Sequence, residues 1–192
     1  MKKIALATLM AISTVGAYAA QPYVEGAFGM ANFNVDCEGS TSCEPNGVGM
    51  KLVGGVTIVP HLAVEVGYIN FGTAKISGLN PQMILMDAKL KSTAMFGAAA
   101  LRAELAKDLT GVARLGLALV DTKIDYSALS GAYTSSNKAS EAKAIFGLGL
   151  EYAIQKNLKI TGAIDLTNSA KSDEILDDGA LRLISVGAQY SF

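Results

Sequence analysis

The stretch 143–166, KAIFGLGLEYAIQKNLKITGAIDL, contains two alternating runs separated by the polar residues QKN at 155–157. In 143–154 large apolar residues occupy most even positions, and the odd positions include Lys143, Gly147, Gly149 and Glu151. The run 158–166 repeats this alternation. Because successive side chains of a β-strand point to opposite faces, the pattern predicts a β-hairpin with one apolar face.

The same alternation recurs along the chain. Eight strands are predicted at 23–31, 48–58, 62–71, 92–105, 111–121, 143–154, 158–166 and 180–192. Each is close to the length that a tilted strand needs to cross a bilayer. Their connections alternate between short ones at 59–61, 106–110 and 155–157 and long ones at 32–47, 72–91, 122–142 and 167–179. This pattern predicts an eight-stranded antiparallel up-and-down transmembrane β-barrel, with both ends on the side of the short turns.

The N-terminus has the features of a secretory signal peptide. Lys2 and Lys3 precede an apolar run that closes on the small-residue site 17–19, AYA. A short membrane anchor is the alternative, but the run is barely long enough to span a bilayer. We expect cleavage after Ala19, with Ala20 as the next choice, so that 1–19 direct export and 20–192 form the barrel.

Composition narrows the class of protein. Mean hydropathy is +0.34, yet beyond residue 20 there is no apolar run of about 18 residues that could form a membrane helix. Without Lys2 and Lys3, the 16 basic residues fall to 14 against 17 acidic ones, which argues against nucleic acid as a partner. A soluble lipocalin-like barrel is the alternative, but the polar face holds Gly, Ala and Ser where a water-facing surface would hold more charge.

Charged residues on the small-residue face are predicted to point into the lumen. They are five acids and five bases, namely Glu25, Lys51, Glu65, Arg102, Glu104, Arg114, Lys143, Glu151, Lys159 and Asp165. An unpaired charge is costly in a narrow lumen, so equal numbers predict a paired network. The network is either a structural plug or a gate whose pairs exchange partners. The plug is favoured because eight strands leave no continuous water column.

The signal peptide, the hairpin pattern and the C-terminal GAQYSF resemble the small outer-membrane barrels of the OmpA/OmpX and opacity-protein type. The resemblance implies an integral protein of a Gram-negative outer membrane, in contact with outer-membrane lipid and lipopolysaccharide. It also implies that the assembly machinery, reached through periplasmic chaperones, reads the last strand through Tyr190 and Phe192. We expect a monomer. Because the chain has no Trp, its aromatic girdles would consist of Tyr and Phe. Phe96 has the parity of the lumen-facing Arg102, unless a bulge shifts the register.

Residues for catalysis or metal binding are few. His61, the only histidine, lies in a short turn, and no G-x-S-x-G is present. No enzyme activity, metal or cofactor is therefore predicted. Cys37 and Cys43 are the only cysteines, and in an exported chain they predict one disulfide.

The predicted function is display of four extracellular loops, with a structural role and contacts to a host or envelope ligand. A small ion-conducting pore is the alternative, and a lipid A-modifying enzyme is a weaker one. In the second long connection, the apolar patch 83–86 is either a contact surface or an extension of the flanking strands.

Overall fold

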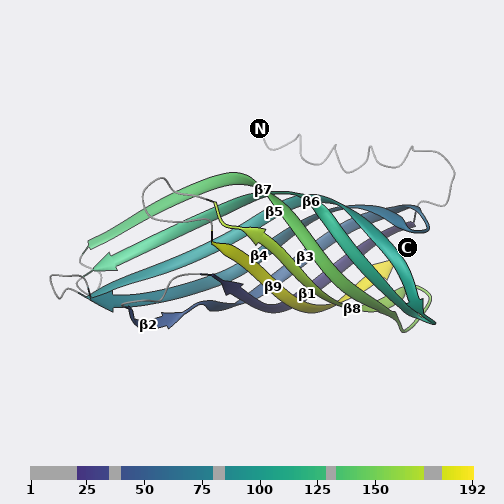
Figure 1. Cartoon of the computed structure of the whole chain (residues 1–192), viewed down its shortest axis with the longest axis horizontal. Helices are drawn as coiled ribbons and strands as arrows, with labels where there is room; N and C mark the ends of the chain where they lie inside the picture. Colours follow the sequence, from purple (N-terminus) through teal and green to yellow (C-terminus); the bar gives the residue numbers. More distant parts are fainter. Residues whose placement is uncertain (1–20, 35–39, 80–84, 129–132, 171–178) are drawn as a thin grey trace.

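Eight antiparallel strands close into a ring in the computed structural model, which describes residues 21–34, 40–79, 85–128, 133–170 and 179–192 (Figure 1). These strands are β1 (Gln21–Phe33), β3 (Asn46–Val59), β4 (Leu62–Leu79), β5 (Leu85–Ala106), β6 (Leu109–Ala128), β7 (Tyr133–Ala153), β8 (Leu158–Asn168) and β9 (Ala180–Ser191). Each pairs with the ring strands before and after it, and β1 pairs with β9 to close the ring. The predicted eight-stranded up-and-down barrel is confirmed. The described residues contain no helix long and apolar enough to cross a membrane.

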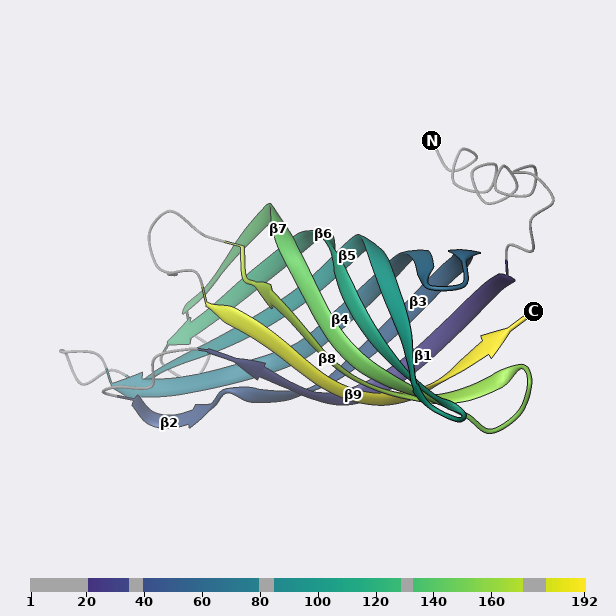
Figure 2. The same ribbon diagram turned by 45° about the vertical axis from the view of Figure 1, so that its right-hand side comes forward.

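The short connections all lie at one end of the barrel, which we call the turn end; the other is the loop end (Figure 2). Both described ends of the chain lie at the turn end, where the Phe192 amide donates a hydrogen bond of 3.0 Å to the Pro22 carbonyl. Between β5 and β6, Asp108 has a φ of 63°, a left-handed conformation that Asp tolerates better than most residues. These tight turns bring consecutive strands into register.

Two of the predicted long connections are wrong in extent. Most of 72–91 and 122–142 is strand, because the pairing of β4 with β5 continues to Leu79 opposite Leu85, and that of β6 with β7 continues to Ala128 opposite Tyr133. Cross-strand hydrogen bonds satisfy these backbones, so their Gly, Ser and Asn residues do not end the strands. In the apolar patch 83–86, residues 85 and 86 belong to β5, so this part of the patch extends a flanking strand. Residues 83 and 84 lie outside the described residues.

A short strand, β2 (Ser40–Glu44), pairs with the loop-end part of β4. Strand β4 thus changes its partner from β3 to β2. The change follows Gly72, which has a φ of 78°. The register of β4 against β5 shifts between Asn70 and Thr73, and the Gly72 amide donates to Asn70 Oδ1 at 2.8 Å. Glycine suits this bulge because it adopts a positive φ without a steric penalty.

Alternation along each strand separates an apolar outer surface from the barrel interior. On the outside, Phe28 is 67% exposed and Leu117 is 70% exposed, whereas Glu65 on the inside is fully buried. Phe96 is also buried, as its parity predicts, and it packs beside Gly67, where an added Cβ would lie 2.5 Å from the ring. The register of β5 shows no shift at Phe96.

Candidate functional site

The barrel interior contains a chain of alternating acids and bases. Its first part joins four strands. Lys51 Nζ on β3 lies 2.8 Å from Asp165 Oδ2 on β8 and 3.2 Å from Glu25 Oε1 on β1. The other oxygen of Glu25, Oε2, accepts a hydrogen bond of 2.8 Å from Arg114 Nη2 on β6. All four side chains are at most 5% exposed.

The second part continues from Arg114. Its Nε donates to Glu65 Oε2 at 2.6 Å, and Arg102 Nη2 reaches Glu65 Oε1 at 3.2 Å. Arg102 Nε then donates to Glu151 Oε1 at 3.1 Å, and Lys159 Nζ donates to Glu151 Oε2 at 2.7 Å. Every acid of this chain thus contacts at least one base. Such pairing offsets the cost of removing the charges from water.

Tyr23 on β1 belongs to the same network. Its hydroxyl donates to Glu65 Oε1 at 2.5 Å and accepts a hydrogen bond of 2.8 Å from Arg102 Nη2. The Arg102 guanidinium carbon also lies 4.7 Å from the centre of the Tyr23 ring, a cation–π geometry. Tyr23 was not predicted as a lumen residue, although it shares the parity of Glu25 and could have been found by the same alternation.

Small residues on facing strands make room for these side chains. A Cβ added to Gly55 on β3 would overlap the Tyr23 ring. One added to Gly147 on β7 would lie 2.6 Å from Asp165 Oδ1 and 3.3 Å from Arg114 Cβ. The Gly-rich inner face therefore reflects packing against large charged side chains, because an eight-stranded interior is only just wide enough to hold them.

Toward the loop end, most of the buried interior is apolar, which the alternation pattern did not lead us to expect. The side chains that form this layer are each at most 1% exposed, and they include Phe33, Ile69, Phe71, Leu181 and Leu183. They pack in one cluster with buried residues of β5 and β6. An ion entering this layer would lose most of its hydration shell and meet only a few polar groups, such as the buried hydroxyls of Ser92 and Thr122.

Eight of the ten predicted lumen charges lie in the acid–base chain. The structure places the other two elsewhere. Lys143 lies nearer the loop end on β7, where its Nζ is 2.8 Å from Glu141 Oε2. Glu104 is exposed near the turn end of β5, and the register of β5 against β6 shifts immediately after it. Its prediction as a network member is wrong, because parity alone does not show where the enclosed part of the lumen ends.

The predicted terminal aromatic residues lie on the outer surface at the turn end. The rings of Tyr190 and Phe192 meet edge to face, with centroids 5.3 Å apart and an interplanar angle of 81°. Tyr152 on β7 is exposed on the same surface. The role of Tyr190 and Phe192 in assembly stays a prediction.

The remaining candidate residues are spread over the barrel. Cys43 lies in β2, and Cys37 lies outside the described residues, so the disulfide stays a prediction. The same holds for the signal peptide at 1–19. His61 is exposed in the turn between β3 and β4. No group of three or more potential metal ligands (His, Cys, Asp or Glu) that could hold a metal ion occurs among the residues that the structure describes.

Comparison with solved structures shows the same fold in several small barrels. The chain resembles the Neisserial surface protein A, with a TM-score of 0.62 and 17% identity over 89% of this chain and 97% of that one. The attachment invasion locus protein Ail of Yersinia pestis, solved with the heparin analogue sucrose octasulfate, gives a TM-score of 0.56 at 17% identity, covering 90% and 99%. OprG of Pseudomonas aeruginosa gives 0.58 at 10% identity, covering 92% and 98%.

Comparison with sequences adds the family. No curated protein sequence matches this chain. The family model for the OmpA-like transmembrane domain matches residues 17–192, which include every described strand. The chain belongs to the OmpA-like transmembrane domain family and is an integral β-barrel of the Gram-negative outer membrane.

Proposed function

We propose that this barrel displays its loop end at the cell surface and makes contacts there with host cells, extracellular matrix or neighbouring envelope components. The orientation is supported by the turn end, which holds both described ends of the chain and in outer-membrane barrels faces the periplasm. In this orientation the extended β4–β5 and β6–β7 hairpins project outward.

The observation that carries this proposal is the filled interior. An ion crossing the barrel would meet both the paired charges around Arg114 and the apolar layer around Phe71. Neither layer offers a wet path, so the outer surface and the loop end are what remains for specific contacts. Ail, the attachment invasion locus protein, shares this fold.

Adhesion of cells that carry the barrel tests the proposal. In one variant, residues 126–135 are replaced by Asn-Gly, which joins the opposed residues Asp125 and Ser136 by a two-residue turn. In a second, 78–86 are replaced in the same way between Ser77 and Asp87. We expect at least one variant to lose binding to epithelial cells or matrix-coated plates while reaching wild-type levels in the outer membrane. Insertion of Gly-Ser in the turn 155–157 at the turn end is the control. Equal adhesion of wild type, both shortened variants and cells without the barrel would contradict the proposal.

Planar-bilayer recordings distinguish display from the alternative of a small ion-conducting pore. We expect no steady open state from the wild-type barrel. A stable, ion-selective conductance that Phe71→Ala increases would show that the interior is a gated path.

A further inference from the structure

A patch of lysines lies on the outside of the barrel wall formed by β4, β5, β6 and β7. This lysine patch consists of exposed residues toward the loop end, Lys75, Lys89, Lys91, Lys123 and Lys138. The register sets lysine opposite lysine three times: Lys75 with Lys89, Lys91 with Lys123, and Lys123 with Lys138. Like charges directly opposite one another destabilise a sheet. The arrangement therefore indicates an anionic partner.

Nearby acids neutralise the lysine patch only in part. Lys123 Nζ lies 2.9 Å from Asp125 Oδ1, and Lys138 Nζ lies 4.0 Å from Asp121 Oδ1. Both pairs are solvent-exposed, and such pairs are weak enough for a ligand to compete with them. Within the described ranges, the other three lysines make no ion pair of 4 Å or less. Glu44 stands opposite Lys75 in the register and Asp125 stands opposite Lys89, so the five lysines of the patch face three nearby acids.

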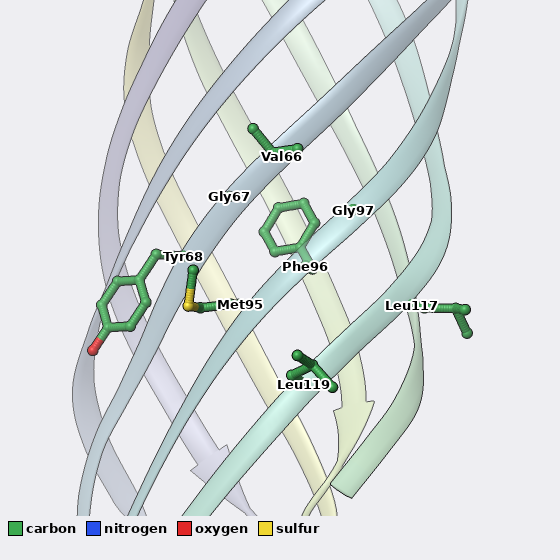
Figure 3. A pocket seen from close by; sticks show the side chains of 8 residues that line it. All are labelled: Val66, Gly67, Tyr68, Met95, Phe96, Gly97, Leu117 and Leu119. Atoms are coloured by element: carbon green, nitrogen blue, oxygen red, sulfur yellow. The ribbon is translucent and has the colours of Figure 1, made fainter. Parts of the chain in front are cut away.

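An apolar groove of about 630 Å³ lies on the same wall, nearer the turn end (Figure 3). Its sides include Val66 and Tyr68 on β4 and Leu117 and Leu119 on β6. Gly97 on β5 stands between Val66 and Leu117 in the register, and a Cβ added there would meet no atom within 4 Å. The wall is thus hollowed where this side chain is absent. The volume lies in the range of roughly 300–1,000 Å³ that ligand pockets have.

The groove and the lysine patch follow one another along the same strands. Tyr68, Met95 and Leu119 form one row across the wall, and the next outward-facing row toward the loop end contains the polar Thr93 and Asp121. Lys91 lies four residues beyond Met95 on β5, which is roughly 13 Å along a strand at about 3.3 Å per residue. A membrane lipid has its charged headgroup at one end and its acyl chains at the other. One lipid molecule can therefore contact both features.

We propose that this wall binds a phosphorylated lipid of the outer leaflet, with its phosphates at the lysine patch and one acyl chain in the groove. Lipopolysaccharide, through its lipid A part, supplies this chemistry in a Gram-negative outer membrane. Lysine ammonium groups form charge-assisted hydrogen bonds to phosphate oxygens. The assignment to the outer leaflet rests on the proposed orientation. A sulfated polysaccharide would engage the lysines without the groove, and the experiment separates the two.

Binding of bisphosphorylated lipid A to the purified, folded barrel in detergent tests the lysine patch. Lys91→Gln with Lys123→Gln is the test variant, and Lys107→Gln with Lys156→Gln at the turn end is the matched control. We expect native mass spectrometry to detect a wild-type complex with one lipid A. We expect the patch variant to bind at least about tenfold more weakly, because two charge-assisted contacts are lost. The control should bind as wild type does, and dephosphorylated lipid A should bind more weakly to all three.

Substitutions that fill the groove test the proposed acyl-chain contact independently of the lysine patch. Gly97→Val places a branched side chain in open space on the groove floor, and Gly162→Val does so on the outside of β8, away from the groove. We expect Gly97→Val alone to weaken lipid A binding, and neither variant to change binding of soluble sucrose octasulfate. Gly97→Ala, which adds only a Cβ in the same open space, is a second groove-filling variant if Gly97→Val folds poorly. Gel mobility of unheated samples reports folding in each case.

Three results would overturn the inference. The first is that the wild type forms no complex with lipid A. The second is that the patch variant and its control bind lipid A equally well. The third is that the groove-filling variants bind lipid A as tightly as Gly162→Val does. If sucrose octasulfate binds as tightly as lipid A and only the lysine substitutions matter, the wall is a polysaccharide site instead. If the wild-type barrel binds no lipid A but still mediates cell adhesion, this inference alone is overturned, because the adhesion test depends on the hairpin tips.

Discussion

Arg114 Nε donates a hydrogen bond of 2.6 Å to Glu65 Oε2 inside the barrel, between residues 49 positions apart in the chain. Both side chains are at most 5% exposed. Because Arg114 also contacts Glu25 and Glu65 also contacts Arg102, this pair connects the two parts of the acid–base chain. Breaking it would leave buried charges without full compensation.

We expect Glu65→Gln to lower the free energy of unfolding by about 3–5 kcal/mol, the usual cost of removing one partner of a buried ion pair. Urea titration of the barrel in lipid vesicles, followed by gel mobility, measures the change. Glu104→Gln serves as the control because Glu104 is exposed. Equal urea midpoints for the two variants would show that Glu65 is solvated in the folded protein.

The apolar layer of the interior should matter more than apolar residues outside. Phe71 is fully buried, and Phe71→Ala leaves a cavity, so we expect a loss of about 3–5 kcal/mol. Phe28 is 67% exposed on the outer surface, where lipid fills the vacated space, and Phe28→Ala should cost clearly less. The same urea titration compares them. A larger loss for Phe28→Ala would contradict the packing described for the interior.

Gly147 and Gly162 form a matched pair for testing space inside and outside the barrel. A Cβ on Gly147 would meet Asp165 and Arg114, whereas one on Gly162 would meet no atom within 4 Å. Gly147→Ala should therefore destabilise the barrel by about 1–3 kcal/mol through overpacking, and Gly162→Ala should leave its stability nearly unchanged. Equal unfolding midpoints would mean that the acid–base chain shifts to accept the methyl group.

The predicted disulfide between Cys37 and Cys43 should shape the first loop without holding the barrel together. The chain-entropy model gives so small a loop a stabilisation of roughly 2 kcal/mol, which acts mainly on the loop. Mass spectrometry after alkylation, with and without reductant, should find no free thiol in unreduced protein from the outer membrane. Cys37→Ser with Cys43→Ser should keep heat-modifiable gel migration. Two alkylated thiols in the unreduced sample would refute the bond.

Removing Phe192 should reduce assembly more than it reduces the stability of the folded barrel. Phe192 is 69% exposed, and its ring meets that of Tyr190 on the outer surface, so its loss should have little effect on the interior. We expect low outer-membrane levels of the truncated chain but nearly normal urea unfolding after refolding in vitro. Phe28→Ala, which removes an exposed ring elsewhere, should reach normal levels. Normal levels of the truncated chain would argue that the ring is no assembly signal.

The alternation of side chains and the positions of the short turns were enough to predict the barrel. Period-two patterns placed Leu148 outside and Glu151 inside, because the pleat alone sends successive side chains to opposite faces. Parity likewise predicted that Phe96 points inward. These are local properties of a strand, so they can be read without knowing its partners.

The length of the strands and the pairing of the buried charges were decided by the tertiary structure. The β4–β5 and β6–β7 hairpins continue far beyond the predicted strands because each backbone is satisfied by the strand opposite, which composition does not reveal. Arg114 could have paired with any acid of the inner face. It meets Glu25, 89 positions away, because closure of the ring brings β1 and β6 to a common lumen. Glu104 has the parity of Arg102, yet it lies exposed near the turn end. The height of a charge along the barrel, and with it the charge's environment, depends on strand register and closure, which one-dimensional alternation does not specify.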